Sequence, residues 1–158
     1  MKALVAYFSA TGGTAKLAKT VSEASGAALY EIRPTVPYQR GDLNWMDKKA
    51  RSTVEMADQS FRVPMADSAA PVAEADVIFV GFPIWWYREP SIIDTFLEAY
   101  DFAGKTVVPF FTSGGSGLGE GQGRMEKLAK GASVLTGKRF RSGASVQEVK
   151  SWIEGLNI

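Results

Sequence analysis

Residues 3–14 read ALVAYFSATGGT, and this stretch decides the fold. Its first six residues are apolar, and a turn of Ser, Thr and Gly residues follows them at once. A short apolar run that ends in a turn signal is typical of a buried strand. Over residues 14–25, Leu17, Val21 and Ala24 recur at helical spacing, and Gly26 marks an end. The stretch therefore predicts a strand, a tight turn and a helix.

The same alternation of strand and helix continues along the chain. Three more apolar runs predict strands at residues 28–32, 77–82 and 106–111, and residues 139–141 suggest a short fifth. Apolar periodicity predicts further helices at residues 91–100, 124–130 and 145–156. Strands that are apolar on both faces belong to a parallel sheet covered by helices on both sides. We therefore expect a doubly wound α/β sheet in a single domain of residues 1–158.

Residues 33–75 do not follow this alternation. They are too many for a bare loop, so the segment should hold structure of its own. Met46, Ala50, Val54 and Ala57 share one phase, which predicts a helix over residues 44–57. We expect the remainder of this insert to be irregular surface chain.

The composition excludes many kinds of chemistry. The chain has no Cys and no His, so it offers no thiolate nucleophile, no Ser-His-Asp triad and no Cys/His metal site. We therefore expect no metal. A proton shuttle near pH 7 would have to be a perturbed carboxylate or lysine, and any redox chemistry requires a bound organic cofactor. The net charge of +1 argues against strong binding of nucleic acid.

The chain shows no targeting or membrane-spanning segment. The apolar run at residues 3–8 is shorter than a secretory signal needs, and no run approaches the roughly 18 apolar residues of a membrane span. We therefore expect a cytoplasmic location and no membrane insertion.

The loop after the first strand has the features of a phosphate site. It contains Ser9, Ala10, Thr11, Gly12, Gly13 and Thr14 and leads directly into a helix. Glycines let backbone N–H groups approach a ligand, and the helix N-terminus adds partial positive charge. Because the loop has no Lys or Arg, its neutral donors suit a terminal phosphate monoester; the alternative is a plain capped turn.

Two later loops should meet the first one, because ligands of open α/β sheets bind beyond the carboxyl ends of the strands. The second loop contains Pro83, Ile84, Trp85, Trp86 and Tyr87, and its three consecutive aromatics cannot all point into a core. Such aromatics offer a stacking surface to a flat ligand. The third loop contains Thr112, Ser113, Gly114, Gly115, Ser116 and Gly117, whose backbone can pass close to a ring edge.

These motifs together resemble the flavodoxin family, in particular short bacterial members with FPIWW and TSGGSG segments, here at residues 82–86 and 112–117. The likeness spans the chain and implies a five-stranded parallel sheet in the order 2-1-3-4-5 with one noncovalent FMN. It implies that residues 9–14 hold the phosphate and that the other two loops, residues 83–87 and 112–117, hold the isoalloxazine ring. It also implies that no residue acts as an acid–base catalyst, because the flavin supplies the chemistry.

The sequence also departs from the family pattern. The third loop has no aromatic residue, so the second face of the ring is either open or covered from the insert by Tyr38 or Trp45. The Trp86–Tyr87 segment lacks the glycine that typical members have in this turn. Typical flavodoxins are acidic, whereas this chain has 18 basic and 17 acidic side chains.

Three functions remain open on this reading. The first is an FMN-binding electron-transfer protein that serves a redox partner protein or a small electron acceptor. The second is an enzyme, an FMN-dependent reductase that takes hydride from NAD(P)H to a quinone-type acceptor. The third is a phosphate-ligand binding module without redox activity. The resemblance favours the first.

Overall fold

The computed structural model describes residues 2–158, so Met1 of the predicted domain lies outside the described residues. The strands are β1 (Ala3–Tyr7), β2 (Ala28–Glu31), β3 (Val77–Pro83), β4 (Thr106–Thr112), β5 (Ser133–Val134) and β6 (Lys138–Arg139). The sheet order is β2-β1-β3-β4-β5, with β6 also paired to β4, and every pairing is parallel. The predicted order 2-1-3-4-5 is confirmed.

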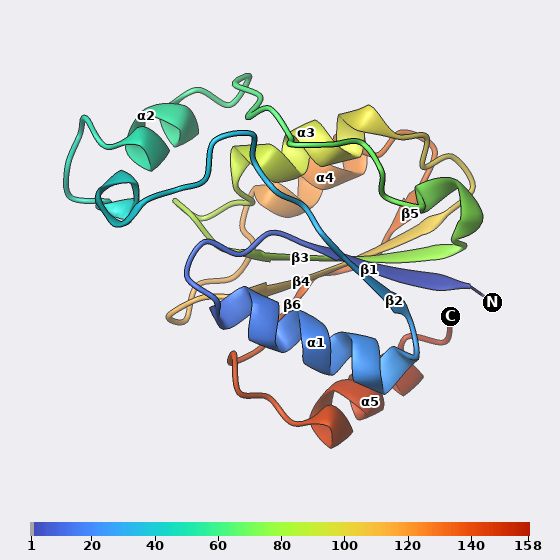
Figure 1. The fold of residues 1–158 in the computed structure, drawn as a ribbon. Helices are drawn as coiled ribbons and strands as arrows, with labels where there is room; N and C mark the ends of the chain where they lie inside the picture. Colours follow the sequence, from blue (N-terminus) through green and yellow to red (C-terminus); the bar gives the residue numbers. More distant parts are fainter. Residues whose placement is uncertain (1) are drawn as a thin grey trace.

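Helices cover both faces of this sheet, as the apolar strands predicted (Figure 1). They are α1 (Gly13–Ser25), α2 (Arg51–Ala57), α3 (Ser91–Ala99), α4 (Gly121–Leu128) and α5 (Val146–Gly155), with short 3-10 helices at Arg40–Leu43 and Val72–Glu74. One buried cluster lies between the sheet and α1 and α5, around Val5, Phe79 and Phe110. The other lies on the face of α3 and α4, around Ile78, Val80 and Phe96. None of the helices within residues 2–158 has the length and apolar character needed to cross a membrane.

The fifth position of the sheet is shared by two short strands. β5 pairs with the start of β4 and β6 with its end. The amide of Gln122 bridges the break between them, because it donates to the Leu135 carbonyl at 3.0 Å and accepts from Gly137 N at 3.0 Å. The prediction of residues 139–141 missed β5 and placed β6 one residue late. Each strand is only two residues long, so pairing with β4 specifies them and no long apolar run announces them.

The predicted helix over residues 44–57 is wrong in its first half, because α2 begins only at Arg51. Asn44 accepts from Met46 N at 3.2 Å, and Asp47 accepts from Lys49 N at 2.9 Å. Such side-chain hydrogen bonds offer the backbone an alternative to helix. The predicted apolar face is also wrong, since Met46 and Val54 are exposed whereas Met56 is buried.

The remaining helices follow their predictions with shifted ends. α4 begins three residues before the predicted 124 and takes in two glycines. Gly121 is required by close packing, because a Cβ there would lie 2.7 Å from Oε1 of Glu89. α5 begins after Ser145, whose Oγ accepts from Glu148 N at 3.1 Å as the predicted cap requires.

We predict that Gly81→Ala destabilises the fold. Gly81 lies in β3, and a Cβ there would overlap the buried ring of Phe110 in β4. Overpacking of this kind costs about 1–3 kcal/mol of unfolding free energy, measured by urea denaturation. Gly155→Ala is the matched control, because its Cβ in α5 would meet open space. Equal stability of the two variants would contradict this account of the β3–β4 packing.

Candidate functional site

Three loops meet at the carboxyl ends of β1, β3 and β4. The Oγ1 atoms of Thr14 and Thr112 lie 2.8 Å apart in a hydrogen bond that joins the first loop to the third. Ile84 N donates to the Thr112 carbonyl at 2.9 Å, which joins the second loop to the end of β4. A Cβ on Gly119 would lie 2.9 Å from the Tyr87 carbonyl oxygen, so the second and third loops also pack closely. The convergence predicted from the parallel strands is therefore present.

The first loop presents an open helix N-terminus. Gly12 is the N-cap of α1 with φ +98°, and its N–H donates to Ser9 Oγ at 3.1 Å. The first turn of α1 has no acidic residue and no side-chain cap, and its first helical bond runs from Lys16 N to the Gly12 carbonyl. The preceding N–H groups, at Gly13 and Thr14, therefore have no acceptor within the helix. This end can bind an anion.

The second loop is a tight turn that separates its aromatics. Trp85 and Arg88 exchange two backbone hydrogen bonds of 3.0 and 3.2 Å, while Trp86 and Tyr87 between them have φ of +48° and +63°. Left-handed backbone at two large residues in succession is strained. Trp85 turns inward, 5.5 Å from the ring of Phe8, whereas Trp86 and Tyr87 are exposed. The expectation that not all three aromatics face the core is confirmed.

The third loop is held by hydrogen bonds around Ser113. Its Oγ donates to the Ser116 carbonyl at 2.6 Å and accepts from Gly115 N at 3.2 Å. Arg139 of β6 donates to the Ser113 carbonyl through Nε at 3.2 Å and Nη2 at 3.0 Å. The sequence analysis missed this role of Arg139, because only the pairing of β6 with β4 brings the guanidinium to the loop.

Two hollows adjoin these loops. The aromatic cleft, about 580 Å³, is lined by Leu43, Trp45, Ser52, Ile84, Trp85, Trp86, Tyr87, Gly114 and Ser116. The arginine cleft, about 440 Å³, is lined by Gly13, Pro83, Ile84, Thr112, Ser113, Arg139, Phe140, Arg141 and Ser142. Ile84 lines both, so the clefts are neighbours. An elongated ligand could therefore extend from the N-terminus of α1 into the aromatic cleft.

Not every predicted residue lines these two clefts. Ser9 and Ala10 border a third hollow of about 390 Å³ on the β2 side. Thr11 and Gly12 are exposed at the start of α1, and Gly115 and Gly117 lie in the third loop. The predicted loops lie together, but their members differ in access to the clefts.

The structure distinguishes the two aromatics expected from the insert. Tyr38 packs 5.3 Å from Trp85, its hydroxyl bonds Glu55, and the Arg51 guanidinium lies 3.9 Å from its ring centroid. Burial and the Glu55 bond raise the Tyr38 pKa far above its usual range. Trp45 instead lines the aromatic cleft and is 71% exposed. Of the two, Trp45 has the access to face a ligand.

A cluster of buried charges lies beneath the second loop, and the sequence analysis missed it. Arg88, Glu89 and Asp94 are 2%, 0% and 0% exposed. Arg124 of α4 donates to Glu89 Oε2 at 3.1 Å and to Asp94 Oδ2 at 2.6 Å. Burial, followed by the neighbouring Asp94, raises the pKa of Glu89 to about 9. The one available signal was a charged pair, Arg88–Glu89, directly before a helix.

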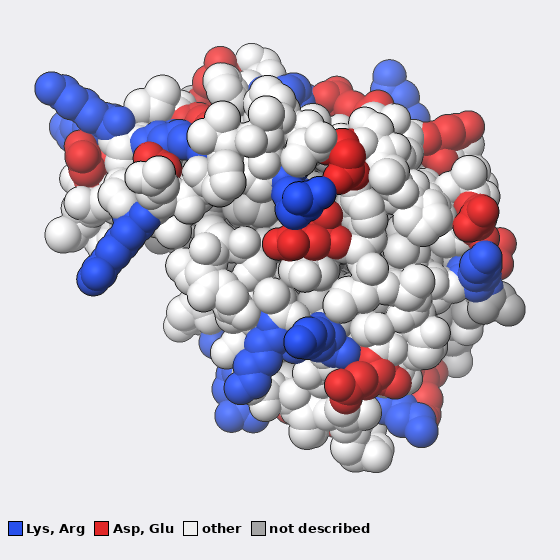
Figure 2. Space-filling model, in the orientation of Figure 1, with Lys and Arg blue, Asp and Glu red and all other residues white. Residues whose placement is uncertain are grey.

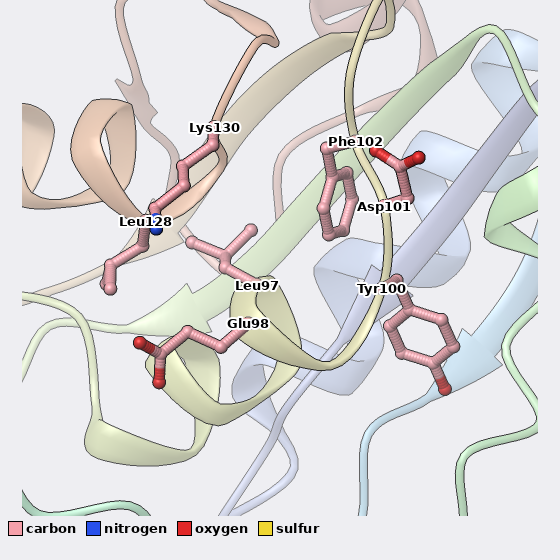
Figure 3. Close-up of a pocket in the computed structure, with 7 residues that line it drawn as sticks. All are labelled: Leu97, Glu98, Tyr100, Asp101, Phe102, Leu128 and Lys130. Atoms are coloured by element: carbon pink, nitrogen blue, oxygen red, sulfur yellow. The ribbon is translucent and has the colours of Figure 1, made fainter.

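A hollow of about 360 Å³ lies away from these loops, at the ends of α3 and α4 (Figure 3). It is lined by Leu97, Glu98, Tyr100, Asp101, Phe102, Leu128 and Lys130. None of these residues belongs to a predicted site. Residues 97–102 precede β4, and Leu128 and Lys130 precede β5, so the hollow lies at the amino ends of these strands, opposite the three loops. This hollow is therefore not part of the candidate site.

Charge around the site comes from different parts of the chain. Lys and Arg side chains project from the lobe that the insert forms beside α2 (Figure 2). Arg139 and Arg141 border the arginine cleft. The described residues include no group of three or more acidic side chains able to hold a metal ion.

Comparisons with known proteins agree with this architecture. A family model described as flavodoxin matches residues 2–156. A proposed flavoprotein from Bacteroides uniformis is 47% identical, with a TM-score of 0.91 and 97% of each chain covered. A proposed flavoprotein from Bacteroides eggerthii is 39% identical, with a TM-score of 0.93, covering 99% of this chain and 98% of that chain.

A more distant structure shares the fold. It is a flavoprotein from Lactobacillus acidophilus in complex with FMN, 21% identical with a TM-score of 0.65, and the match covers 96% of this chain and 98% of that chain. No match was found among curated proteins. The family model spans nearly the whole chain, and the observed sheet order is the one that the family resemblance implied. The chain belongs to the flavodoxin family.

Proposed function

We propose that this protein binds FMN and transfers electrons as a flavodoxin. The observation that carries the proposal is the adjacency of the two clefts: the anion-binding end of α1 borders the arginine cleft, which meets the aromatic cleft at Ile84. A phosphate group joined to a flat ring system matches this arrangement. The Lactobacillus acidophilus flavoprotein of the same fold, which binds FMN, supports it.

The residues of the first loop fit the phosphate of FMN. The N–H groups of Gly13 and Thr14 are free of helical acceptors, and the dipole of α1 favours an anion at this end. The Thr14 hydroxyl can accept from Thr112 and donate its own proton to a phosphate oxygen. Arg141 at the rim of the arginine cleft adds positive charge, so the neutral donors expected from the loop are supplemented from α5's side of the sheet.

The residues of the other two loops fit the ring. Trp86 and Tyr87 would stack on one face, and the backbone of the third loop would border the ring edge. A Cβ on Gly114 would meet nothing within 4 Å, so space remains beside this backbone. When bound, FMN would supply the electron-transfer chemistry; the chain's own residues hold it, orient it and limit its contact with water. A partner protein or a small acceptor would approach from the side of Trp45.

A substitution in the first loop tests the proposed phosphate site. Thr14→Val should weaken FMN binding by about 1–3 kcal/mol, roughly 5- to 150-fold in Kd, because a buried hydroxyl partner is lost. Fluorescence titration of FMN into flavin-free protein measures this. Thr20→Val on the same helix is the matched control, since its hydroxyl bonds only the Lys16 carbonyl.

The same titration with the native protein tests the third candidate function. Colourless protein that leaves FMN fluorescence unchanged would support the phosphate-binding module without redox activity.

The second prediction separates the two tryptophans. Trp86→Ala should lower FMN affinity with little loss of stability, because its side chain is exposed in the turn. Trp85→Ala should lower the unfolding free energy by about 3 kcal/mol, because its ring packs against Phe8 and Tyr38. Urea denaturation of the flavin-free proteins and FMN titration together test both statements. The reverse pattern would show that Trp85 is the stacking residue.

A specific observation favours the reductase as the second candidate function. The aromatic cleft extends to Leu43 and Trp45 of the insert, which leaves room for a small molecule beside a bound ring. A reductase should oxidise NADPH or NADH steadily when a quinone is present, whereas a carrier should need a separate reductase. Absorbance at the reduced nicotinamide band, followed with pure FMN-loaded protein, decides between them. If the protein oxidises neither NADPH nor NADH, the electron-carrier function is the one supported.

A further inference from the structure

Two buried carboxyl groups beneath the second loop bind the same guanidinium. Glu89 ends this loop and Asp94 lies in the first turn of α3, and both side chains are fully buried. Arg124 engages one oxygen of each, Glu89 Oε2 at 3.1 Å and Asp94 Oδ2 at 2.6 Å. Arg88 adds a weaker contact to Asp94 Oδ2 at 3.5 Å. One guanidinium therefore bridges two carboxyl groups away from water.

The other two oxygens of the pair lack partners. Glu89 Oε1 and Asp94 Oδ1 are buried, and no hydrogen bond reaches either from the residues described. A buried carboxylate oxygen without a donor is costly. One proton on the pair lowers its charge from −2 to −1 and so reduces the repulsion between two carboxyl groups that share one guanidinium. Burial and the neighbouring Asp94 raise the pKa of Glu89 to about 9, which agrees with this arrangement.

The Glu89–Asp94 pair lies where the Trp86–Tyr87 turn packs against neighbouring elements. Arg88 closes the Trp86–Tyr87 turn and donates to the Glu89 and Met56 carbonyls, both at 3.1 Å. The Glu89 carboxyl also packs against Gly121 at the start of α4, where only a glycine leaves room for it. The turn is strained at two residues, so it keeps its shape only if its neighbours hold it.

We propose that Glu89 and Asp94 share one proton and that the protonated pair, clamped by Arg124, positions the Trp86–Tyr87 turn at the aromatic cleft. Glu89 and Asp94 are thus positioning residues that act through Trp86. The sharing of the proton does not depend on any ligand. The consequence for flavin binding rests on the proposed function.

The charges around the pair come from four elements. Arg88 belongs to the second loop and Arg124 to α4, and Glu120 is the N-cap of α4. Arg62 of the insert lies 3.8 Å from Asp94 Oδ2 and is itself bound to Glu98 of α3. With one proton on the pair, Asp94 supplies the negative charge that the three guanidinium groups face. Glu89 then serves as a neutral hydrogen-bonding group.

The sign of the pH dependence follows from where the proton is released. Unfolded Glu89 loses its proton near its ordinary pKa of 4.5, whereas the folded protein keeps it to about pH 9. Between these values the folded state binds more protons, so this group's stabilisation falls as pH rises and is lost through pH 9. The unfolding constant of the native protein should therefore rise by up to tenfold per pH unit relative to that of a variant with a neutral residue in place of Glu89.

The decisive comparison is Glu89→Gln against Asp94→Asn, measured by urea denaturation of flavin-free protein at pH 6 and pH 8. Glu89→Gln replaces a neutral acid by a neutral amide, so the variant should stay folded. Between pH 6 and pH 8 the unfolding constant of the native protein should rise by up to 100-fold relative to that of this variant. Asp94→Asn should be less stable than the native protein at both. Glu154→Gln, at an exposed carboxylate of α5, is the control and should show no relative change.

Two further measurements complete the test. The native protein should show the infrared band of a protonated carboxylic acid at pH 7, and it should vanish above pH 10; this needs no variant. FMN affinity of the native protein should decline above pH 9, and that decline should be absent from Glu89→Gln. Equal losses of stability in Glu89→Gln and Asp94→Asn, or no such band, would overturn the shared proton. An unchanged alkaline decline in Glu89→Gln would overturn the positioning role. Absence of FMN binding at every pH would reject the proposed function. The shared proton would then be tested by urea denaturation and the infrared band alone.

Discussion

The hydrogen-bonded placement of β3 between β1 and β4 is the constraint on which the site depends. The register pairs Tyr7 with Gly81 and Pro83 with Thr112, so the three strands end at nearly the same level. Three loops distant in sequence must then leave the sheet side by side. The Thr14–Thr112 hydrogen bond and the Ile84–Thr112 backbone bond follow from that register. Gly81 allows the close contact with Phe110 that this part of the sheet requires.

Charge in this protein is arranged differently from what a count along the chain suggests. Residues 83–124 hold five acidic and three basic side chains, which would indicate an acidic surface around the second and third loops. Glu89 and Asp94 are in fact fully buried against Arg88 and Arg124. Arg139 and Arg141, which border the arginine cleft, come from a later part of the chain. Burial removes these carboxyl groups from the surface that a ligand or partner meets.

Much of the fold was predictable because it depends on local patterns. The apolar runs predicted the four long strands, and helical periodicity predicted α1, α3 and α5 within a few residues. The sheet order was implied by the resemblance to the flavodoxin family. The insert was not predictable in this way. Asn44 and Asp47 divert the backbone into turns before α2, and the helix buries Met56 where periodicity pointed to Met46 and Val54. Side-chain hydrogen bonds of this kind compete with helix locally and do not alter the apolar pattern.

The sequence by itself determined which three loops form the candidate site, because parallel strands release their loops at one edge and these loops carry the Gly, Ser, Thr and Trp residues. Only the tertiary structure decided the roles within them. It turned Trp85 inward and Trp86 outward through a left-handed turn that no glycine announces. It brought Trp45 to the aromatic cleft and packed Tyr38 against Trp85. It also enclosed Glu89 and Asp94 with Arg124, since burial and the distance between charges exist only once separate elements have packed together.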